Sequence, residues 1–349
     1  MPMANSRRRS KNNNTALWLK ILIFVLIFVV AAIFLGRSKD KKEDETIWQE
    51  GSMLRIGDTQ VDYREGLIYL NAVQEQYEQY YGSDIWQYAV DSRGNTMGEL
   101  IKAQVLDQII YIKVVCQKAD ELAIVLSEEE LLQVEEQTTE YMEQIQGSDL
   151  LLYGINADIA RRIYADNLLA RKTFEVTTLN VDTDIPDVEA AQRRYQTIAI
   201  RTYKIDASGN RVSYEGTERT ELLARVEALR TQALETNDFY KLAAANTEDA
   251  TMLEVTGGVG DFPEEYEDKV LALKAGQVSE VIETTDYLYI FYCVTEFDED
   301  ATQAKKEEMI SLRQEEEFER CYEEWKEQIP IEVNEEVWDS LGFDMGAEG

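Results

Sequence analysis

The chain has 349 residues, no histidine and three cysteines, and its formal net charge at pH 7 is −33. The absence of histidine excludes Ser-His-Asp and Cys-His catalysis, and it excludes zinc held by histidine. Residues 1–42 carry nine Lys or Arg and one Asp, a net charge of +8, which leaves −41 for residues 43–349. A body this acidic is repelled by nucleic-acid phosphates, so we expect no nucleic-acid partner, and no motif indicates a cofactor or a metal.

An apolar segment near the N-terminus, Ala16–Leu35, is long enough to cross a membrane. As a helix its twenty residues span roughly 30 Å, which is the thickness of the hydrocarbon core. The basic cluster Arg7-Arg8-Arg9 precedes it, and the positive-inside rule then places the N-terminus in the cytoplasm and the acidic body outside the cell. The alternative is a signal peptide cleaved near Val30-Ala31-Ala32, although the apolar run is long for that class.

Helical periodicity dominates the next part of the chain, residues 53–186. Apolar residues recur at spacings of three and four in three stretches, residues 61–81, 96–123 and 150–174. Ser127-Glu128-Glu129-Glu130 has the form of a capping box, and it opens a further helix that ends at Gly147. Helices with a single apolar stripe bury these stripes against one another, which predicts a bundle-like module.

After Pro186 the pattern changes to a mixture of strands and helices. Runs of β-branched and aromatic residues predict strands at 192–203, 278–284 and 287–297. Helices are predicted at 217–235, 239–245 and 269–274, and a glycine-rich loop at 257–260. This order of elements predicts a compact α+β domain. A last charged helix, residues 301–328, has one apolar side and is expected to pack back onto the helical module.

Four short motifs in residues 193–297 resemble the parvulin family of peptidyl-prolyl cis-trans isomerases. In chain order they are Asp238-Phe239-Tyr240-Lys241-Leu242-Ala243, similar to the family's DF..LA; Thr247-Glu248-Asp249, similar to Ser-x-Asp; Gly257–Phe262, similar to GGDLGxF; and Leu273–Thr284, similar to L..GEVSxPVxT. The helices before and after this stretch resemble the chaperone module of the PrsA/SurA kind of extracytoplasmic foldase. The resemblance implies α+β architecture, with PrsA/SurA-like helices flanking a parvulin-like domain.

Both histidines of the family pattern are replaced in this chain. Where the family's first strand carries Arg-His-Ile-Leu, this chain has Gln196-Thr197-Ile198-Ala199, and where the last strand carries Gly-Tyr-His-Ile it has Asp286-Tyr287-Leu288-Tyr289. The resemblance assigns Asp249 and Thr197 to catalysis and Tyr266, Phe262 and Leu288 to substrate binding. It implies unfolded or partly folded secreted proteins with Xaa-Pro segments as partners, with the membrane contacted through the N-terminal helix.

The expected organisation follows from these patterns together. In chain order the segments are a cytoplasmic basic tail at 1–15, a transmembrane signal anchor at 16–36, a tether at 37–52, a helical chaperone-like domain at 53–186, a parvulin-like domain at 187–298, and a C-terminal helix with a tail at 299–349. The expected location is the cell membrane, with a single pass and the C-terminal part extracellular.

Prolyl isomerisation breaks no covalent bond, and its barrier of roughly 18–20 kcal/mol is the partial double-bond character of the amide. An enzyme therefore needs only to bind the twisted amide more tightly than the planar one. Tyr266 and Phe262 would hold the proline ring, and Asp249 would adjust the electrostatic field around the amide. The same residues could instead simply pack the domain core. Three hypotheses stay open: an isomerase, a non-catalytic chaperone, and a scaffold for one specific partner.

Overall fold

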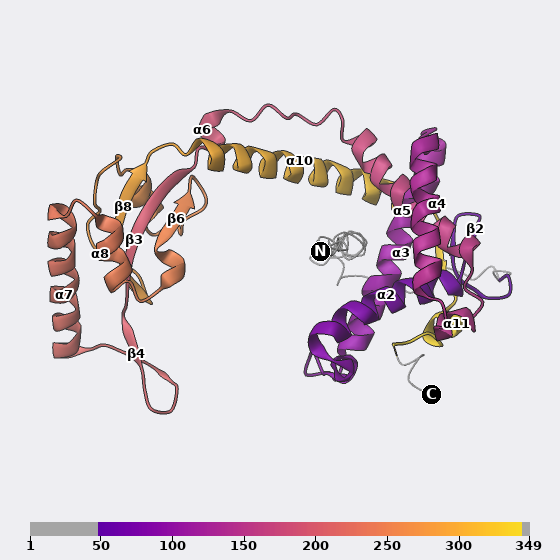
Figure 1. Cartoon of the computed structure of the whole chain (residues 1–349), viewed down its shortest axis with the longest axis horizontal. Helices are drawn as coiled ribbons and strands as arrows, with labels where there is room; N and C mark the ends of the chain where they lie inside the picture. Colours follow the sequence, from indigo (N-terminus) through magenta and orange to yellow (C-terminus); the bar gives the residue numbers. More distant parts are fainter. Residues whose placement is uncertain (1–47, 344–349) are drawn as a thin grey trace, which may run out of the picture. The chain divides into compact units, whose positions relative to one another are not determined.

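The computed structural model describes residues 48–343, so the apolar segment Ala16–Leu35 lies outside the described residues. Within the described range, no helix is long and apolar enough to cross a membrane. The chain divides into two compact units: residues 48–180 with 317–343 form the first, and residues 181–316 form the second (Figure 1). Each unit has its own hydrophobic core.

The first unit is a helical module. Its helices are α2 (Tyr63–Tyr81), α3 (Met97–Glu121), α4 (Glu128–Gln144) and α5 (Ala157–Thr177), with the short turns η1 (Ser83–Gln87) and η2 (Asp149–Leu151). The capping box predicted at Ser127 is confirmed, because its hydroxyl accepts from the Glu130 N–H while the Glu130 carboxylate accepts from the Ser127 N–H. The last helix, α10 (Glu299–Gln328), contributes Phe318, Tyr322 and Trp325 to the core of this unit.

A three-stranded antiparallel sheet in the first unit was not predicted by the helical periodicity. Its strands are β1 (Ser52–Ile56), β2 (Thr59–Asp62) and β9 (Ile331–Val333), in the order β2-β1-β9, and the short helix α11 (Glu335–Asp339) follows. The helix expected from residue 61 therefore begins at Tyr63, capped by Asp62, whose carboxylate accepts from the Arg64 N–H. The helix expected from residue 150 begins only at Ala157, after Gly154 with φ +78° and the capping residue Asn156.

The second unit is α+β, as predicted. Its sheet has the order β6-β3-β8-β7, with β3 (Arg193–Arg201), β6 (Glu254–Gly257), β7 (Ile282–Glu283) and β8 (Tyr287–Thr295), all neighbours antiparallel. The other elements are α6 (Asp187–Ala190), α7 (Gly216–Glu235), α8 (Phe239–Asn246), η3 (Ala250–Met252), α9 (Glu267–Leu271) and the hairpin β4 (Tyr203–Ile205) with β5 (Arg211–Ser213). The strand expected at 278–284 is mostly loop, because its first part makes only an isolated bridge, Val278 to Tyr292.

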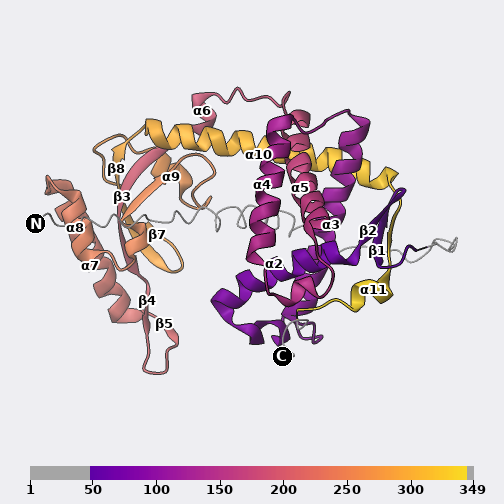
Figure 2. The same cartoon turned by 45° about the vertical axis from the view of Figure 1, so that its right-hand side comes forward.

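Alternate residues of β3 and β8 face opposite sides of this sheet. On one side Tyr195, Ala199, Tyr289 and Phe291 pack with residues of α9 and of the loop before it. On the other side the strands pack against α7 and α8, and this core includes Ile198, Ile200, Leu288 and Ile290. Figure 2 shows α9 on one side of β3 and β8, with α7 and α8 on the other. The position of a residue in β8, odd or even, therefore decides which core it joins.

Candidate functional site

Five aromatic side chains form a continuous cluster on the α9 side of the sheet: Tyr195, Phe262, Tyr266, Tyr289 and Phe291. Ring centroids lie 5.6 Å apart for Tyr195 and Phe262, 6.4 Å for Phe262 and Tyr266, and 5.9 Å for Tyr266 and Tyr289. These separations fall in the range that favours tilted and edge-to-face aromatic pairs. We call these five residues the aromatic face.

The structure brings together two predicted substrate-binding residues, Phe262 and Tyr266, in the aromatic face. Phe262 reaches the sheet because Gly257 has no side chain. A Cβ at position 257 would lie only 2.8 Å from the phenyl ring. The neighbouring aromatic rings cover both residues, which are only 8% and 6% exposed. Little of either ring is therefore open to a ligand in this conformation.

Leu288 does not lie with the other predicted site residues. It is fully buried in the opposite core, against the α7 and α8 side. Its neighbour Tyr289 lies opposite Ala199 and belongs to the aromatic face, while Thr197 lies opposite Phe291. Tyr289 is therefore the β8 residue diagonal to Thr197 on the aromatic face. The alternation along Tyr-Leu-Tyr-Ile-Phe contains this signal, because the aromatic residues occupy every second position.

Thr197 lies on β3 between Tyr195 and Ala199 and is fully buried. Its N–H donates to the Leu253 carbonyl over 3.1 Å, but its hydroxyl oxygen has no hydrogen-bond partner within residues 48–343. A buried polar group without a partner costs about 1–3 kcal/mol. The hydroxyl is therefore an unsatisfied group on the face where the family pattern has a histidine.

Asp249 lies at the edge of the aromatic face, where it caps η3. Its Oδ1 accepts from the Thr251 N–H over 3.0 Å and from the Thr251 hydroxyl over 2.6 Å. The hydroxyl of Thr251 is the main cause that lowers the pKa of Asp249, and Tyr287 and Arg201 lower this pKa further. Tyr287 stacks on Tyr289 with 5.5 Å between ring centroids, which joins the carboxylate to the aromatic face. The motifs in the sequence did not identify Tyr287 or Arg201.

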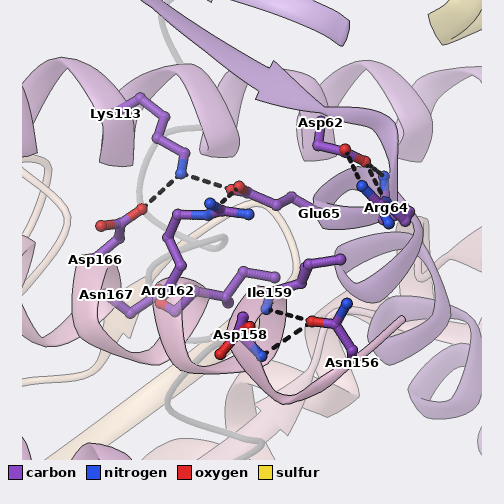
Figure 3. Close-up of polar contacts among 11 residues, drawn as sticks. Asp62, Arg64, Glu65, Lys113, Asn156, Asp158, Ile159, Arg162, Asp166 and Asn167 are labelled. Carbon is purple, nitrogen blue, oxygen red and sulfur yellow. Dashed lines mark hydrogen bonds and ion pairs between the residues drawn. The ribbon is translucent and has the colours of Figure 1, made fainter. Parts of the chain in front are cut away.

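A second polar cluster lies in the helical unit and joins α2, α3 and α5 (Figure 3). Lys113 Nζ lies 2.6 Å from Glu65 Oε2 and 2.6 Å from Asp166 Oδ2, and the Arg162 Nε–H donates to Glu65 Oε1 over 2.8 Å. Burial lowers the pKa of Lys113, but the two carboxylates outweigh burial and raise it overall. These contacts join Glu65 of α2, Lys113 of α3, and Arg162 and Asp166 of α5, so the cluster links the three helices. No group of His, Cys, Asp or Glu within residues 48–343 is arranged to hold a metal ion.

Two family models match this chain. Residues 4–149 match the SurA-like N-terminal domain, and residues 210–295 match the PPIC-type PPIase domain, a peptidyl-prolyl isomerase domain. The second match includes Asp249, Phe262 and Tyr266 and begins after β3, so Thr197 lies outside it. No curated protein matches the chain in sequence.

Several solved structures are similar to the chain at low identity. Foldase protein PrsA from Streptococcus pneumoniae is 17% identical, over 72% of this chain and 97% of its own, with a TM-score of 0.32. Peptidylprolyl isomerase PrsA from Bacillus cereus is 17% identical, over 76% and 100%, with a TM-score of 0.32. A structure from a study of two SurA-like chaperones of Campylobacter jejuni is 10% identical, over 81% and 99%, with a TM-score of 0.28.

Proposed function

Because the chain is a parvulin-type, PrsA/SurA-like protein, we propose that it is a membrane-anchored extracytoplasmic foldase that assists the folding of secreted proteins. A PPIC-type domain and a SurA-like domain in one chain support a foldase or chaperone role. The apolar run Ala16–Leu35 and the basic cluster before it support the anchor and its orientation. The clients that we propose are unfolded or partly folded secreted proteins with Xaa-Pro segments.

The observation that carries the proposal is the PPIC-type match together with the aromatic face and Asp249 at its edge. A proline ring would pack against Tyr266 and Phe262 after these side chains open outward. The Arg201 guanidinium would then donate to the amide carbonyl, whose direction changes as the bond twists, while the Tyr287 hydroxyl stays on the Asp249 carboxylate. Donors that fit only the twisted amide lower the barrier without any covalent step.

The test is the exchange between cis and trans forms of Xaa-Pro peptides, measured by NMR with the full chain in lipid nanodiscs. Tyr266→Ala removes the ring that would hold proline, and Asp249→Asn removes the charge at the edge while leaving the aromatic face intact. Tyr240→Ala is the matched control, because Tyr240 is an exposed tyrosine of α8 outside the aromatic face. Acceleration that persists in the control and is lost in both site variants supports catalysis.

A specific observation favours a second candidate function, a chaperone that does not catalyse isomerisation. Phe262 and Tyr266 are covered by their neighbours, and the chain has no histidine. A non-catalytic chaperone would suppress the aggregation of an unfolded protein and leave cis/trans exchange of every peptide at its spontaneous rate. Measuring both properties on the same preparation separates the two functions.

A further inference from the structure

Three tyrosines of the helical unit are exposed to an unusual degree. Tyr80, Tyr81 and Tyr88 have exposed fractions of 67%, 68% and 65%, and they lie within nine residues of the chain. The other exposed aromatic residues within 48–343 are Tyr240 at 43% and Phe297 at 45%, both in the second unit. We call Tyr80, Tyr81 and Tyr88 the tyrosine patch.

The tyrosine patch lies at the end of α2, where buried and half-buried aromatic side chains pack together. The helix stops at Gly82, which has φ +75°, and η1 then packs against α2. The Tyr77 ring lies 5.7 Å from Trp86, the Trp86 Nε1–H donates to Glu78 over 2.7 Å, and Trp86 stacks on Phe343 with 3.9 Å between centroids. Tyr77, Trp86 and Phe343 thus anchor the turn. The Tyr81 ring lies 6.1 Å from Tyr77, and all three tyrosines of the patch stay exposed.

The charge around the patch indicates what it binds. Residues 74–95 hold four Asp or Glu and a single Arg, Arg93, a net charge of −3. Arg93 is already paired, because its Nε–H donates to Asp91 over 3.0 Å. The faces of tyrosine rings attract cations, and Glu75 and Asp84 are exposed carboxylates in the same segment. A peptide segment that carries both cationic and apolar side chains complements this surface. A second copy of this acidic chain or an anionic lipid surface is repelled by it.

We propose that the tyrosine patch binds cationic segments of unfolded client proteins, with Lys or Arg side chains over the ring faces and apolar side chains against the ring edges. This inference rests on the proposed function and names its client class. Extended segments fit because three exposed tyrosines within nine residues of the chain give successive side chains separate contacts. Compact acidic proteins would not bind there.

The experiment measures binding of two labelled, unstructured peptides to the full chain in nanodiscs of zwitterionic lipid. One peptide contains lysine and phenylalanine, and the other has glutamate in place of every lysine. We expect the lysine peptide to bind and the glutamate peptide to bind far more weakly. The triple variant Tyr80→Ser, Tyr81→Ser, Tyr88→Ser should weaken lysine-peptide binding on the order of tenfold or more, from the loss of three cation–π contacts. The matched variant Tyr240→Ser, Phe297→Ser should bind as the parent does.

Three outcomes would overturn the inference. In the first, the parent chain binds both peptides equally. In the second, the triple variant binds as the parent does. In the third, the triple variant only converts an oligomer into monomers, which makes the patch an interface between copies. A parallel assay of aggregation suppression separates this inference from the proposed function. A parent chain that suppresses aggregation but ignores peptide charge contradicts only the client class, whereas one that neither suppresses aggregation nor binds either peptide contradicts the proposed function.

Discussion

Replacing Thr197 by valine should stabilise the second unit, although threonine to valine is usually unfavourable at a hydrogen-bonded site. The Thr197 hydroxyl is fully buried and has no partner within the described residues. Valine has nearly the same shape, so the substitution removes the desolvation cost of the hydroxyl and creates no cavity. The expected gain is about 1–3 kcal/mol, which corresponds to a rise of several degrees in the melting temperature.

Thr202, one residue after the end of β3, provides the matched control. Thr202 is also buried, at 6% exposed, but its hydroxyl donates to the Thr285 carbonyl over 2.6 Å. Thr202→Val removes a hydrogen bond and leaves that carbonyl without this donor, so it should destabilise the unit by roughly 1 kcal/mol or more. The same chemical change is therefore expected to have opposite signs at the two positions.

Hydrogen exchange of the β3 and β8 amides reports the stability of the second unit separately from that of the helical unit. Protection of these amides should rise in Thr197→Val and fall in Thr202→Val. Equal losses of protection in both variants would refute the reasoning, because they would mean that the Thr197 hydroxyl has a partner such as a buried water. A rise in protection with loss of isomerase activity would indicate that the hydroxyl is retained for the substrate.

Four further substitutions test the rest of the structure. Leu288→His should destabilise the second unit by several kcal/mol in urea unfolding, because it buries an imidazole in the α7 and α8 core, whereas Tyr289→His should be much milder. Lys113→Met leaves two carboxylates without their shared partner and should cost about 3–5 kcal/mol, measured by exchange in α3. The Asp249 carboxyl, followed by NMR, should have a pKa below the usual aspartate value of about 4. The stability that this lowered pKa provides is present at neutral pH and is lost as pH falls through the lowered pKa. Thr251→Val should move the Asp249 pKa back up.

The sequence determined those features that depend on neighbours within one helical turn. The capping box at Ser127 needs only Glu130 three residues later, and the structure forms it. The α+β character of the second unit also follows from local runs of strand and helix formers. The resemblance placed Tyr266 and Phe262 next to each other, and in the structure both belong to the aromatic face, because they lie on the short stretch between the glycine loop and α9.

Tertiary structure decided the features that depend on distant partners. The small sheet of the first unit exists because Ile56 pairs with Ile331 at the other end of the chain, and no local pattern near either residue requires this pairing. In β8 the register against β3 places Tyr289 on the aromatic face and Leu288 in the opposite core. A shift by one residue moves a side chain from one face of a sheet to the other, so a sequence motif alone does not determine the face. Whether a side chain is covered, as Tyr266 is, depends on neighbours that only the folded chain supplies.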